Sequence, residues 1–265
     1  PLYSSAASDV YKRQAVCGTD RNDLLVHGEQ PVAPEAEEKY LNWIRQRAEH
    51  IPLQQLTGEQ GFMGLTFSVN EHVLIPRQDT EILVEEVLKE LHDGMRVLDM
   101  CTGSGCILLS LLHYSNDCEG LGVDLSAEAL EVAGRNVLKV LTPEKAEHAH
   151  FLQSDLFEKV EGKFEIIVSN PPYIASAEVE KLMPEVRDHE PRMALDGTED
   201  GLYFYRRIIE EAGKHLVSSG MLFFEIGYDQ GQAVSELMRT EGYCDVQVVQ
   251  DYACLLYTSP SPRDR

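Results

Sequence analysis

The sequence predicts an α/β protein built on a doubly wound, mostly parallel β-sheet. From Pro76 onward, short apolar runs typical of buried strands alternate with amphipathic stretches typical of helices. Repeated strand–helix–strand units of this kind give parallel strands with helices packed on the sheet. Several of the apolar runs end in a polar or glycine-containing turn. Because open α/β sheets bind ligands at the carboxyl ends of their strands, these turns are the candidate functional positions.

The predicted elements follow one another without an internal repeat or a low-complexity linker. Strands are predicted over 96–100, 120–124, 150–153, 164–169, 221–226 and 245–251. Helices are predicted over 79–91, 105–113, 127–140, 203–217 and 230–240. Together these elements place the sheet domain over residues 76–253.

A smaller helical region precedes the sheet domain. Residues 15–60 form its predicted extent, and 35–51 carries apolar residues at helical spacing before Pro52 ends the helix. Residues 61–75 combine alternating apolar residues with glycines, which predicts a β-hairpin linker. Residues 1–14 and 254–265 resemble translated sequencing-adapter segments and are excluded from the fold prediction. We therefore expect the natural protein to be truncated at both ends.

The composition excludes several classes of protein. The formal net charge is −22, and a surface this acidic repels phosphate backbones, which argues against broad nucleic-acid binding. The longest apolar runs are too short to cross a bilayer, and no secretory signal opens the chain. The six cysteines form no CxxC pair. This spacing fits reduced thiols, so we expect no metal site and a cytoplasmic location.

The tetrapeptide Asn170-Pro171-Pro172-Tyr173 is the most informative local feature. It follows the predicted strand 164–169, and two prolines cannot continue a sheet because they lack N–H donors and fix φ. The strand must therefore stop and leave Asn170 at its carboxyl end with free polar groups. A plain proline-rich turn is the alternative interpretation.

A second candidate site follows the first predicted strand. Asp99 ends that strand, and Cys101, Thr102, Gly103, Ser104 and Gly105 turn into the next helix. Glycines allow a close approach to a ligand, and the helix start presents free N–H groups. Leu108 stands where a dinucleotide fingerprint needs glycine, which weakens a pyrophosphate interpretation. Asp99 favours a cationic, phosphate-free ligand such as S-adenosylmethionine; a tight strand–helix turn remains the alternative.

Two further acidic positions end the next two strands. Asp124 comes 25 residues after Asp99, and a carboxylate there can accept hydrogen bonds from ribose hydroxyls. Ser126 can equally cap the following helix. Asp155 and Leu156 follow the third strand and could hold an adenine ring, although a helix N-cap at Ser154 or Asp155 explains them equally well. All of these positions are predicted to lie on one edge of the sheet.

The tetrapeptide suits methyl transfer to a planar amino group. An amide nitrogen is a poor nucleophile because its lone pair is delocalised, and the amino groups of adenine and cytosine share this problem. The Asn170 side-chain oxygen and the Pro171 carbonyl can accept both N–H bonds of such a group and stabilise the charge that develops on nitrogen. Rigid prolines lower the entropy cost of binding, and Tyr173 can pack on the planar group.

Four segments make the resemblance specific. They are 74–81 (LIPRQDTE), 99–105 (DMCTGSG), 170–174 (NPPYI) and 190–197 (EPRMALDG). Through them the chain resembles the protein-(glutamine-N5) methyltransferases that modify class 1 peptide chain release factors, over essentially all of 15–253. The resemblance implies a class I, Rossmann-like S-adenosylmethionine-dependent methyltransferase domain, a hairpin linker and an N-terminal helical, substrate-binding domain, which is shortened here.

The resemblance also assigns roles. Cys101 to Gly105, Asp124, Leu156 and Asn170 would contact S-adenosylmethionine, and the tetrapeptide would hold the glutamine of a Gly-Gly-Gln motif. Arg77 and Thr80 would lie in the loop over the site, and Phe62 near the substrate entrance. The partners implied are class 1 release factors, with no direct nucleic-acid or membrane contact, and the protein is expected to be a monomer.

The chain departs from the family pattern at a few positions. Cys101 stands where many relatives have glycine, and Thr198 where a second glycine is common. The family's final strand, beside the strand near Met221, would fall where the adapter-like residues begin, so we expect that strand to be missing and sheet edges to be exposed. Two other functions stay open: an adenine-N6 or cytosine-N4 nucleic-acid methyltransferase, and a cofactor-binding scaffold without activity.

Overall fold

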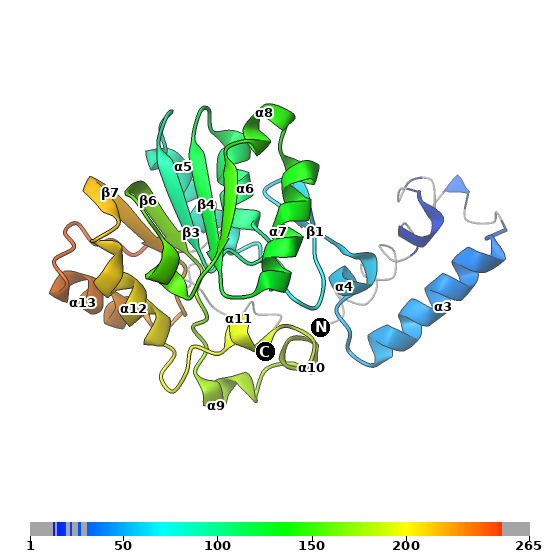
Figure 1. Ribbon diagram of the computed structural model, residues 1–265. Helices are drawn as coiled ribbons and strands as arrows, with labels where there is room; N and C mark the ends of the chain where they lie inside the picture. Colours follow the sequence, from blue (N-terminus) through cyan, green and yellow to red (C-terminus); the bar gives the residue numbers. More distant parts are fainter. Residues whose placement is uncertain (1–12, 14, 20–21, 23–25, 28–30, 251–265) are drawn as a thin grey trace.

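The computed structural model describes residues 13, 15–19, 22, 26–27 and 31–250 (Figure 1). Helix α3 (Pro34–Ala48) extends to one side of the sheet domain, and α4 (Leu53–Thr57) leads back to it. The predicted helix 35–51 is confirmed, but it ends at Ala48, before Pro52 fixes the backbone in an extended turn.

A five-stranded parallel sheet forms the centre of the molecule. Its strands are β3 (Arg96–Met100), β4 (Glu119–Asp124), β5 (Ala149–Gln153), β6 (Phe164–Ser169) and β7 (Leu216–Phe224). Their order across the sheet is β5-β4-β3-β6-β7, and every neighbouring pair is parallel. The strand order reverses between β3 and β6, which confirms the predicted doubly wound sheet and marks the crevice where such sheets bind ligands.

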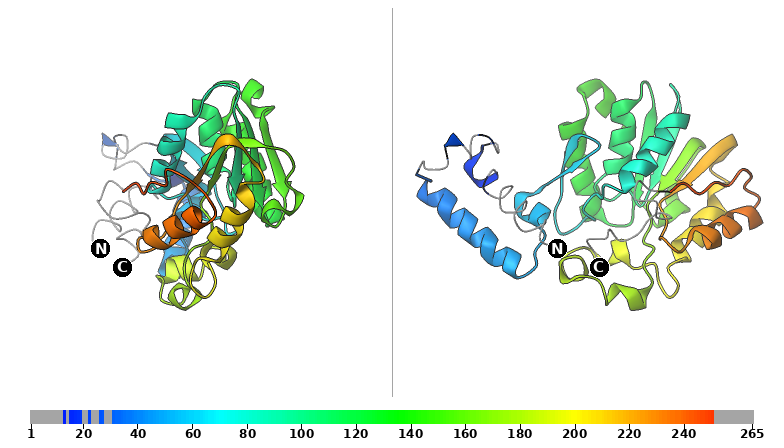
Figure 2. Two further views of the ribbon diagram at one scale, coloured as in Figure 1. Left: turned by 90° about the vertical axis from the view of Figure 1, so that its left-hand side faces the viewer. Right: turned by 180° about the vertical axis from the view of Figure 1, so that it is seen from behind.

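Helices cover both faces of the sheet, because alternate residues of its strands point to opposite sides. Val97 and Ile166 belong to one core with α5 (Thr80–Glu90) and α6 (Cys106–Tyr114). Leu98 and Ile167 belong to the other, which holds Ile208 of α12 (Tyr203–Ala212). Two more helices flank these layers, α7 (Ala127–Val140) beside α6 and α13 (Gly231–Thr240) beside α12. Figure 2 shows the helices on both faces of the sheet in two further views.

The boundary between α12 and β7 differs from the prediction. A helix was expected over 203–217 and a strand over 221–226, but the helix ends at Ala212 and the strand begins at Leu216. The buried face of α12 consists of Tyr205, Ile208, Ile209 and Ala212, so it is complete where the helix ends. Leu216 pairs with Phe164 instead, and the pairing is irregular before it resumes at Met221.

The predicted strand 245–251 is not found at 245–249, and Asp251 lies outside the described residues. An extended segment needs a neighbouring strand for its backbone groups, and within the described residues β7 pairs only with β6. Val248 and Val249 are accordingly 39% and 44% exposed. The place of the family's final strand also falls outside the described part of the chain.

The hairpin of β1 (Glu59–Phe62) and β2 (Leu65–Ser68) joins α4 to the sheet domain. Phe62 and Phe67 contact each other edge to face and belong to the core around α5 and α6. The buried Asn136 of α7 accepts a hydrogen bond from the Ser68 N–H (2.7 Å) and donates to the Ser68 carbonyl (3.1 Å). The hairpin is therefore fixed to the sheet domain by both apolar and polar contacts.

Short helices that the sequence did not predict occupy the connections. They are α8 (Pro143–Ala146), the 3₁₀ turn η1 (Leu156–Lys159), α9 (Ser176–Val179), α10 (Pro184–Arg187) and α11 (Arg192–Leu195). Elements of about four residues carry no readable period, so pattern alone cannot show them. None of the helices in the described residues combines the length and apolar character needed to cross a membrane.

Candidate active site

One cavity opens at the carboxyl ends of β3, β4 and β6, the edge that the sequence singled out. Its wall is contributed by segments far apart in the chain, from residue 72 to residue 204. The predicted residues on this wall are Arg77, Thr80, Cys101, Thr102, Gly103, Ser104, Asp124, Asp155, Leu156, Asn170 and Pro172. The structure thus gathers most of the predicted cofactor and substrate positions into one site.

The loop after β3 is held in place by hydrogen bonds to Asp99. This side chain is fully buried and does not line the cavity. Its Oδ2 atom accepts a hydrogen bond from the Thr102 hydroxyl (2.6 Å) and another from the Leu108 N–H (3.3 Å). Burial raises the pKa of Asp99 to about 7. The structure therefore places Asp99 as a support of the loop, whereas the sequence suggested direct attraction of a cationic ligand.

Asp124 connects the loop to the end of β4. Its carboxylate accepts hydrogen bonds from the Gly103 N–H (2.8 Å) and the Ser126 N–H (2.9 Å). Burial raises the pKa of Asp124, while these backbone donors oppose the rise. Ser126 caps α7, because its hydroxyl accepts a hydrogen bond from the Ala129 N–H (3.0 Å). The capping role proposed for Ser126 is confirmed, and Asp124 itself lies on the cavity wall.

The end of β5 supplies the far side of the cavity. Asp155 lines it and pairs with Arg207 of α12 at 2.8 Å. The Ser154 hydroxyl accepts a hydrogen bond from the Lys159 N–H (3.1 Å), while the Asp155 side chain makes no capping bond. Leu156 is buried with φ at 48°, a left-handed conformation that turns the chain at the cavity. Ser154 thus makes the side-chain hydrogen bond to the local backbone, and Asp155 lines the cavity.

The tetrapeptide after β6 is held rigidly by its surroundings. The Tyr173 carbonyl accepts a hydrogen bond from the Gln230 side chain (2.9 Å). A Cβ atom at Gly197 would lie 2.8 Å from the Pro172 carbonyl oxygen, and one at Gly201 would lie 2.3 Å from the Tyr173 oxygen. Only glycine permits this close approach, so the segment after Asp196 packs directly on the tetrapeptide backbone.

Five predicted site residues lie off the cavity wall: Phe62, Asp99, Gly105, Pro171 and Tyr173. Phe62 differs most from expectation, because its side chain is 1% exposed within the core instead of standing at an entrance. It points inward from β1 to contact Phe67. Tyr173 packs beside the cluster of Tyr205, Ile209 and Val234.

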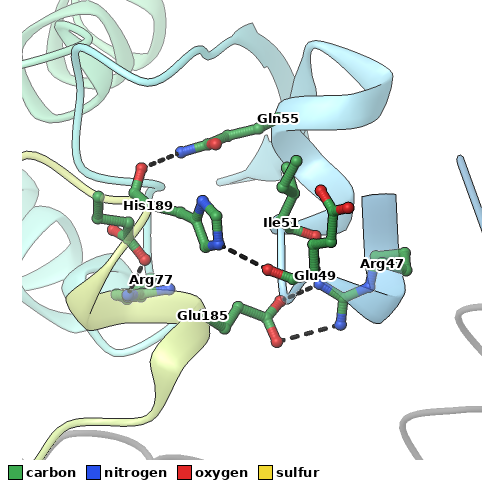
Figure 3. Close-up of polar contacts among 8 residues, drawn as sticks. Arg47, Glu49, Ile51, Gln55, Arg77, Glu185 and His189 are labelled. Atoms are coloured by element: carbon green, nitrogen blue, oxygen red, sulfur yellow. Dashed lines mark hydrogen bonds and ion pairs between the residues drawn. The ribbon is translucent and has the colours of Figure 1, made fainter. Parts of the chain in front are cut away.

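The loop that carries Arg77 is tied to the segment 184–190, as Figure 3 shows. Arg77 pairs with the buried Glu190 at 2.6 Å, and the second oxygen of Glu190 accepts a hydrogen bond from the Ile75 N–H (3.2 Å). These contacts join the segments 74–81 and 190–197, which are two of the four segments that resemble the family. The sequence did not identify Glu190 as their link, because its partners lie more than a hundred positions away.

The N-terminal helices contact the same segment. Arg47 of α3 makes two hydrogen bonds to the Glu185 carboxylate, at 2.9 and 3.1 Å. The Gln55 side chain donates to the His189 carbonyl (2.7 Å), and a ring nitrogen of His189 contacts the Glu49 carbonyl oxygen at 2.9 Å (Figure 3). The end of α3 and the short α4 are thereby fixed beside the loop over the cavity.

Glu225 is the second residue that sequence reasoning missed. It directly follows β7 at the same edge of the sheet and is 4% exposed. Burial raises its pKa to about 7, and hydrogen bonds from Thr80 and Asn170 oppose the rise. Asn170 in turn donates from its side-chain nitrogen to the Thr80 hydroxyl at 3.5 Å. A buried acid therefore stands next to the asparagine predicted to act on the substrate.

The residues on the wall fit a cationic, phosphate-free cofactor such as S-adenosylmethionine. A Cβ atom at Gly103, where φ is 55°, would meet nothing within 4 Å, so this glycine leaves open space in front of the loop. The wall combines apolar side chains with the carboxylates of Asp124 and Asp155, which suit a cationic, hydroxyl-bearing ligand better than a diphosphate. Within the described residues, no cluster of potential metal ligands is present.

Comparisons with known proteins indicate the family of the two parts of the chain. Residues 77–186 match the family described as Methyltransferase small domain, and 13–58 match the PrmC N-terminal domain. A release factor glutamine methyltransferase of Clostridium acetobutylicum is 42% identical over 238 residues, covering 88% of this chain and 83% of that protein. One from Moorella thermoacetica is 44% identical over 241 residues, covering 89% and 84%.

Solved structures show the same fold at low sequence identity. The hMettl16 catalytic domain matches with a TM-score of 0.55 at 18% identity, covering 71% of this chain and 70% of that one. A methyltransferase from Pyrococcus furiosus matches with a TM-score of 0.50 at 19% identity, covering 71% and 83%. The predicted class I methyltransferase fold is confirmed.

Proposed function

The chain belongs to the release factor glutamine methyltransferase family, and we propose that it methylates the side-chain nitrogen of the glutamine in the Gly-Gly-Gln motif of class 1 release factors. It is a methyltransferase by family and by fold. The observation that carries the substrate assignment is the identity of about two residues in five with these relatives over most of both chains.

We propose that S-adenosylmethionine binds along the cavity, where it supplies an electrophilic methyl group on a sulfonium. The loop from Cys101 to Gly105 would border its amino-acid portion, and Asp124 would accept hydrogen bonds from ribose hydroxyls. Asp155 and Leu156 would border the adenine. Support comes from the open space at Gly103 and from the position of Asp124 and Asp155 on one wall.

The substrate amide would be held by Asn170 and its neighbours. The Asn170 oxygen and the Pro171 carbonyl would accept the two N–H bonds, which aims the nitrogen lone pair along the cavity and stabilises positive charge on that nitrogen. The backbone contacts of Tyr173 with Gln230 and of Pro172 with Gly197 keep these acceptors in place. The nitrogen sheds its proton after the positive charge forms, so no strong base is required.

We further propose that residues 15–60 form a substrate-binding domain and that Arg77 and Thr80 lie over the bound glutamine. The contacts of Arg47 and Gln55 with 185–189 support a fixed placement of α3 and α4 near the cavity. The protein would act in the cytoplasm as a monomer. Base methylation of nucleic acid is not favoured, since the curated relatives are release factor enzymes and the chain carries a net charge of −22.

The test is mass spectrometry of a purified class 1 release factor after incubation with this protein and S-adenosylmethionine. We expect one added methyl group on the glutamine of Gly-Gly-Gln and none on a release factor with that glutamine replaced by alanine. DNA and RNA serve as parallel acceptors with labelled cofactor. Methylation of nucleic acid without methylation of the release factor would overturn the assignment.

A further inference from the structure

We propose that Glu225 is a positioning residue that acts on Asn170, both directly and together with Thr80, to keep the side-chain oxygen of Asn170 facing the substrate. The inference rests on the proposed methyl transfer to an amide, because that chemistry requires the oxygen of Asn170, rather than its NH₂ group, to face the cavity. It concerns a side chain that neither the motifs nor the family resemblance singled out.

The backbone fixes Glu225 beside the catalytic tetrapeptide. Its N–H donates to the Ser169 carbonyl at 3.0 Å, and its carbonyl accepts a hydrogen bond from the Tyr205 hydroxyl at 2.8 Å. Ser169 immediately precedes Asn170, and its own hydroxyl donates to the Met100 carbonyl (2.6 Å). Glu225 and Asn170 therefore begin their loops side by side at the ends of paired strands.

The order of donors and acceptors sets the asparagine orientation. An ionised carboxylate only accepts hydrogen bonds, so a neighbouring hydroxyl must point its proton at it. With its one proton directed at Glu225, the Thr80 hydroxyl can only accept from Asn170. The Asn170 nitrogen lies 3.5 Å from the Thr80 oxygen and also donates to the Glu225 carboxylate, so both neighbouring groups act as acceptors toward it. The Asn170 oxygen is then left for the substrate. If the amide were flipped, the Asn170 oxygen would face the Thr80 oxygen, and two acceptors would meet without a proton between them.

This arrangement of donors and acceptors depends on whether Glu225 is protonated. Asp79 disfavours and Arg77 favours its ionised form, while Cys106 of α6 and Tyr205 of α12 are the other titratable groups that it faces. Burial raises the pKa of Glu225 to about 7, and its Oε2 atom has no hydrogen-bond partner among the described residues. A protonated Glu225 could donate its proton to the Thr80 hydroxyl or directly to the oxygen of a flipped Asn170 amide, so the flipped orientation would no longer be excluded.

The variants Glu225→Gln and Thr80→Val remove the obligatory acceptor and the connecting hydroxyl. For Glu225→Gln we expect kcat of methyl transfer to fall roughly 10-fold or more, and for Thr80→Val, which leaves Glu225 as an acceptor for Asn170, to fall by a smaller factor. The KM for the release factor and the cofactor affinity should change much less in both. Thr80→Ser keeps the hydroxyl and should restore most of the rate. The matched control is Glu210→Gln, an exposed acid on α12 that makes the same chemical change away from the cavity.

The pH profile separates positioning from a purely structural role. Wild-type kcat should rise with pH through an apparent pKa near that of Glu225, and this dependence should disappear in Glu225→Gln but persist in Glu210→Gln. Asp99, which titrates in the same range, is unchanged in both variants. An unaltered kcat in Glu225→Gln, or a loss that is explained by weaker cofactor binding alone, would overturn the proposal.

A second measurement does not depend on the substrate. The side-chain amide resonance of Asn170, identified as the one absent in Asn170→Ala, should shift with the ionisation of Glu225 in the wild type and lose that shift in Glu225→Gln. A resonance that does not respond to pH in the wild type refutes the proposal. If the wild type shows this shift but does not methylate a release factor, the proposed function fails while the positioning role stands.

Discussion

The two halves of the sheet build their parts of the site in different ways. On the β3–β4–β5 side, the loop after one strand contacts the strand end beside it, as Gly103 does with Asp124 across 21 positions. On the β6–β7 side, Asn170 meets Thr80 across 90 positions, and Arg77 meets Glu190 across 113. We call these the cofactor half and the substrate half. The first is local in sequence, whereas the second is assembled by tertiary structure.

This difference predicts which property a mutation in each half should change. A local loop keeps its shape through its own backbone hydrogen bonds, so a single change there should weaken cofactor binding and leave the substrate contacts in place. The substrate half depends on several distant segments that meet around one asparagine, so a change there should reduce the rate. The variants below test that separation, from the largest expected effect to the smallest.

Replacing Asn170 by alanine should have the largest effect. It removes the proposed acceptor for the developing positive charge, and the loss of one such preorganised group costs about 10²–10³ in rate. We expect kcat for methyl transfer to a release factor to fall by that factor, while circular dichroism and thermal unfolding show a retained fold. An unchanged rate in single-turnover experiments would contradict the role given to Asn170 and remove the distinction between the two halves.

Replacing Asp124 by alanine should mainly weaken cofactor binding. The change removes a carboxylate on the cavity wall that also accepts a hydrogen bond from the Gly103 N–H. Because hydrogen bonds to charged groups contribute about 1.5–3 kcal/mol, we expect the affinity for S-adenosylmethionine to fall about 10–100-fold. Titration calorimetry measures this, with the exposed Glu131→Ala of α7 as the control. An affinity equal to that of the control would exclude Asp124 from the cofactor site.

Each half also contains a buried acid whose pKa is raised to about 7, Asp99 in the cofactor half and Glu225 in the substrate half. The folded state binds their protons more tightly than the unfolded state, so the free energy of unfolding falls as pH rises toward and through their folded pKa values of about 7. For one such group, the fall between pH 6 and pH 8 is about 1.4 kcal/mol.

Asp99→Asn cannot titrate, so its loss of stability between pH 6 and pH 8 should be smaller than that of the wild type by about 1.4 kcal/mol. Urea denaturation at the two pH values measures this difference, and the exposed Asp93→Asn should behave like the wild type. An equal pH dependence in Asp99→Asn and the wild type would show that Asp99 stays ionised in the folded protein.

The same contrast explains what the sequence could predict. Cys101 to Ser104 and Leu156 come after strands that apolar runs make visible, and Asp124 is the last residue of such a strand. Their convergence therefore follows from the parallel order of the strands. Glu225 was missed because a strand was predicted through residue 226, whereas β7 ends at Phe224 and leaves Glu225 as the first residue after it. Asn136 and Glu190 were missed because their partners are distant in sequence.

Replacing Thr198 by glycine should have the smallest effect, and in the stabilising direction. Thr198 lies in the segment that packs on the tetrapeptide and adopts φ of 72°, a left-handed conformation that is unfavourable for a β-branched residue. Its carbonyl accepts a hydrogen bond from the Ser176 N–H (2.8 Å), so the native backbone is retained when the side chain is removed. Relief of strain should raise the free energy of unfolding by about 1 kcal/mol.

Chemical denaturation measures this change, and Thr66→Gly in the exposed part of β2 provides the control with the opposite sign. There the backbone is an ordinary strand, so glycine adds only disorder to the unfolded chain and should destabilise the protein by about 1 kcal/mol. If Thr198→Gly also destabilises, the threonine side chain makes a net favourable contribution at that position. In that case the favourable contacts of the Thr198 side chain would outweigh the strain of its left-handed backbone conformation.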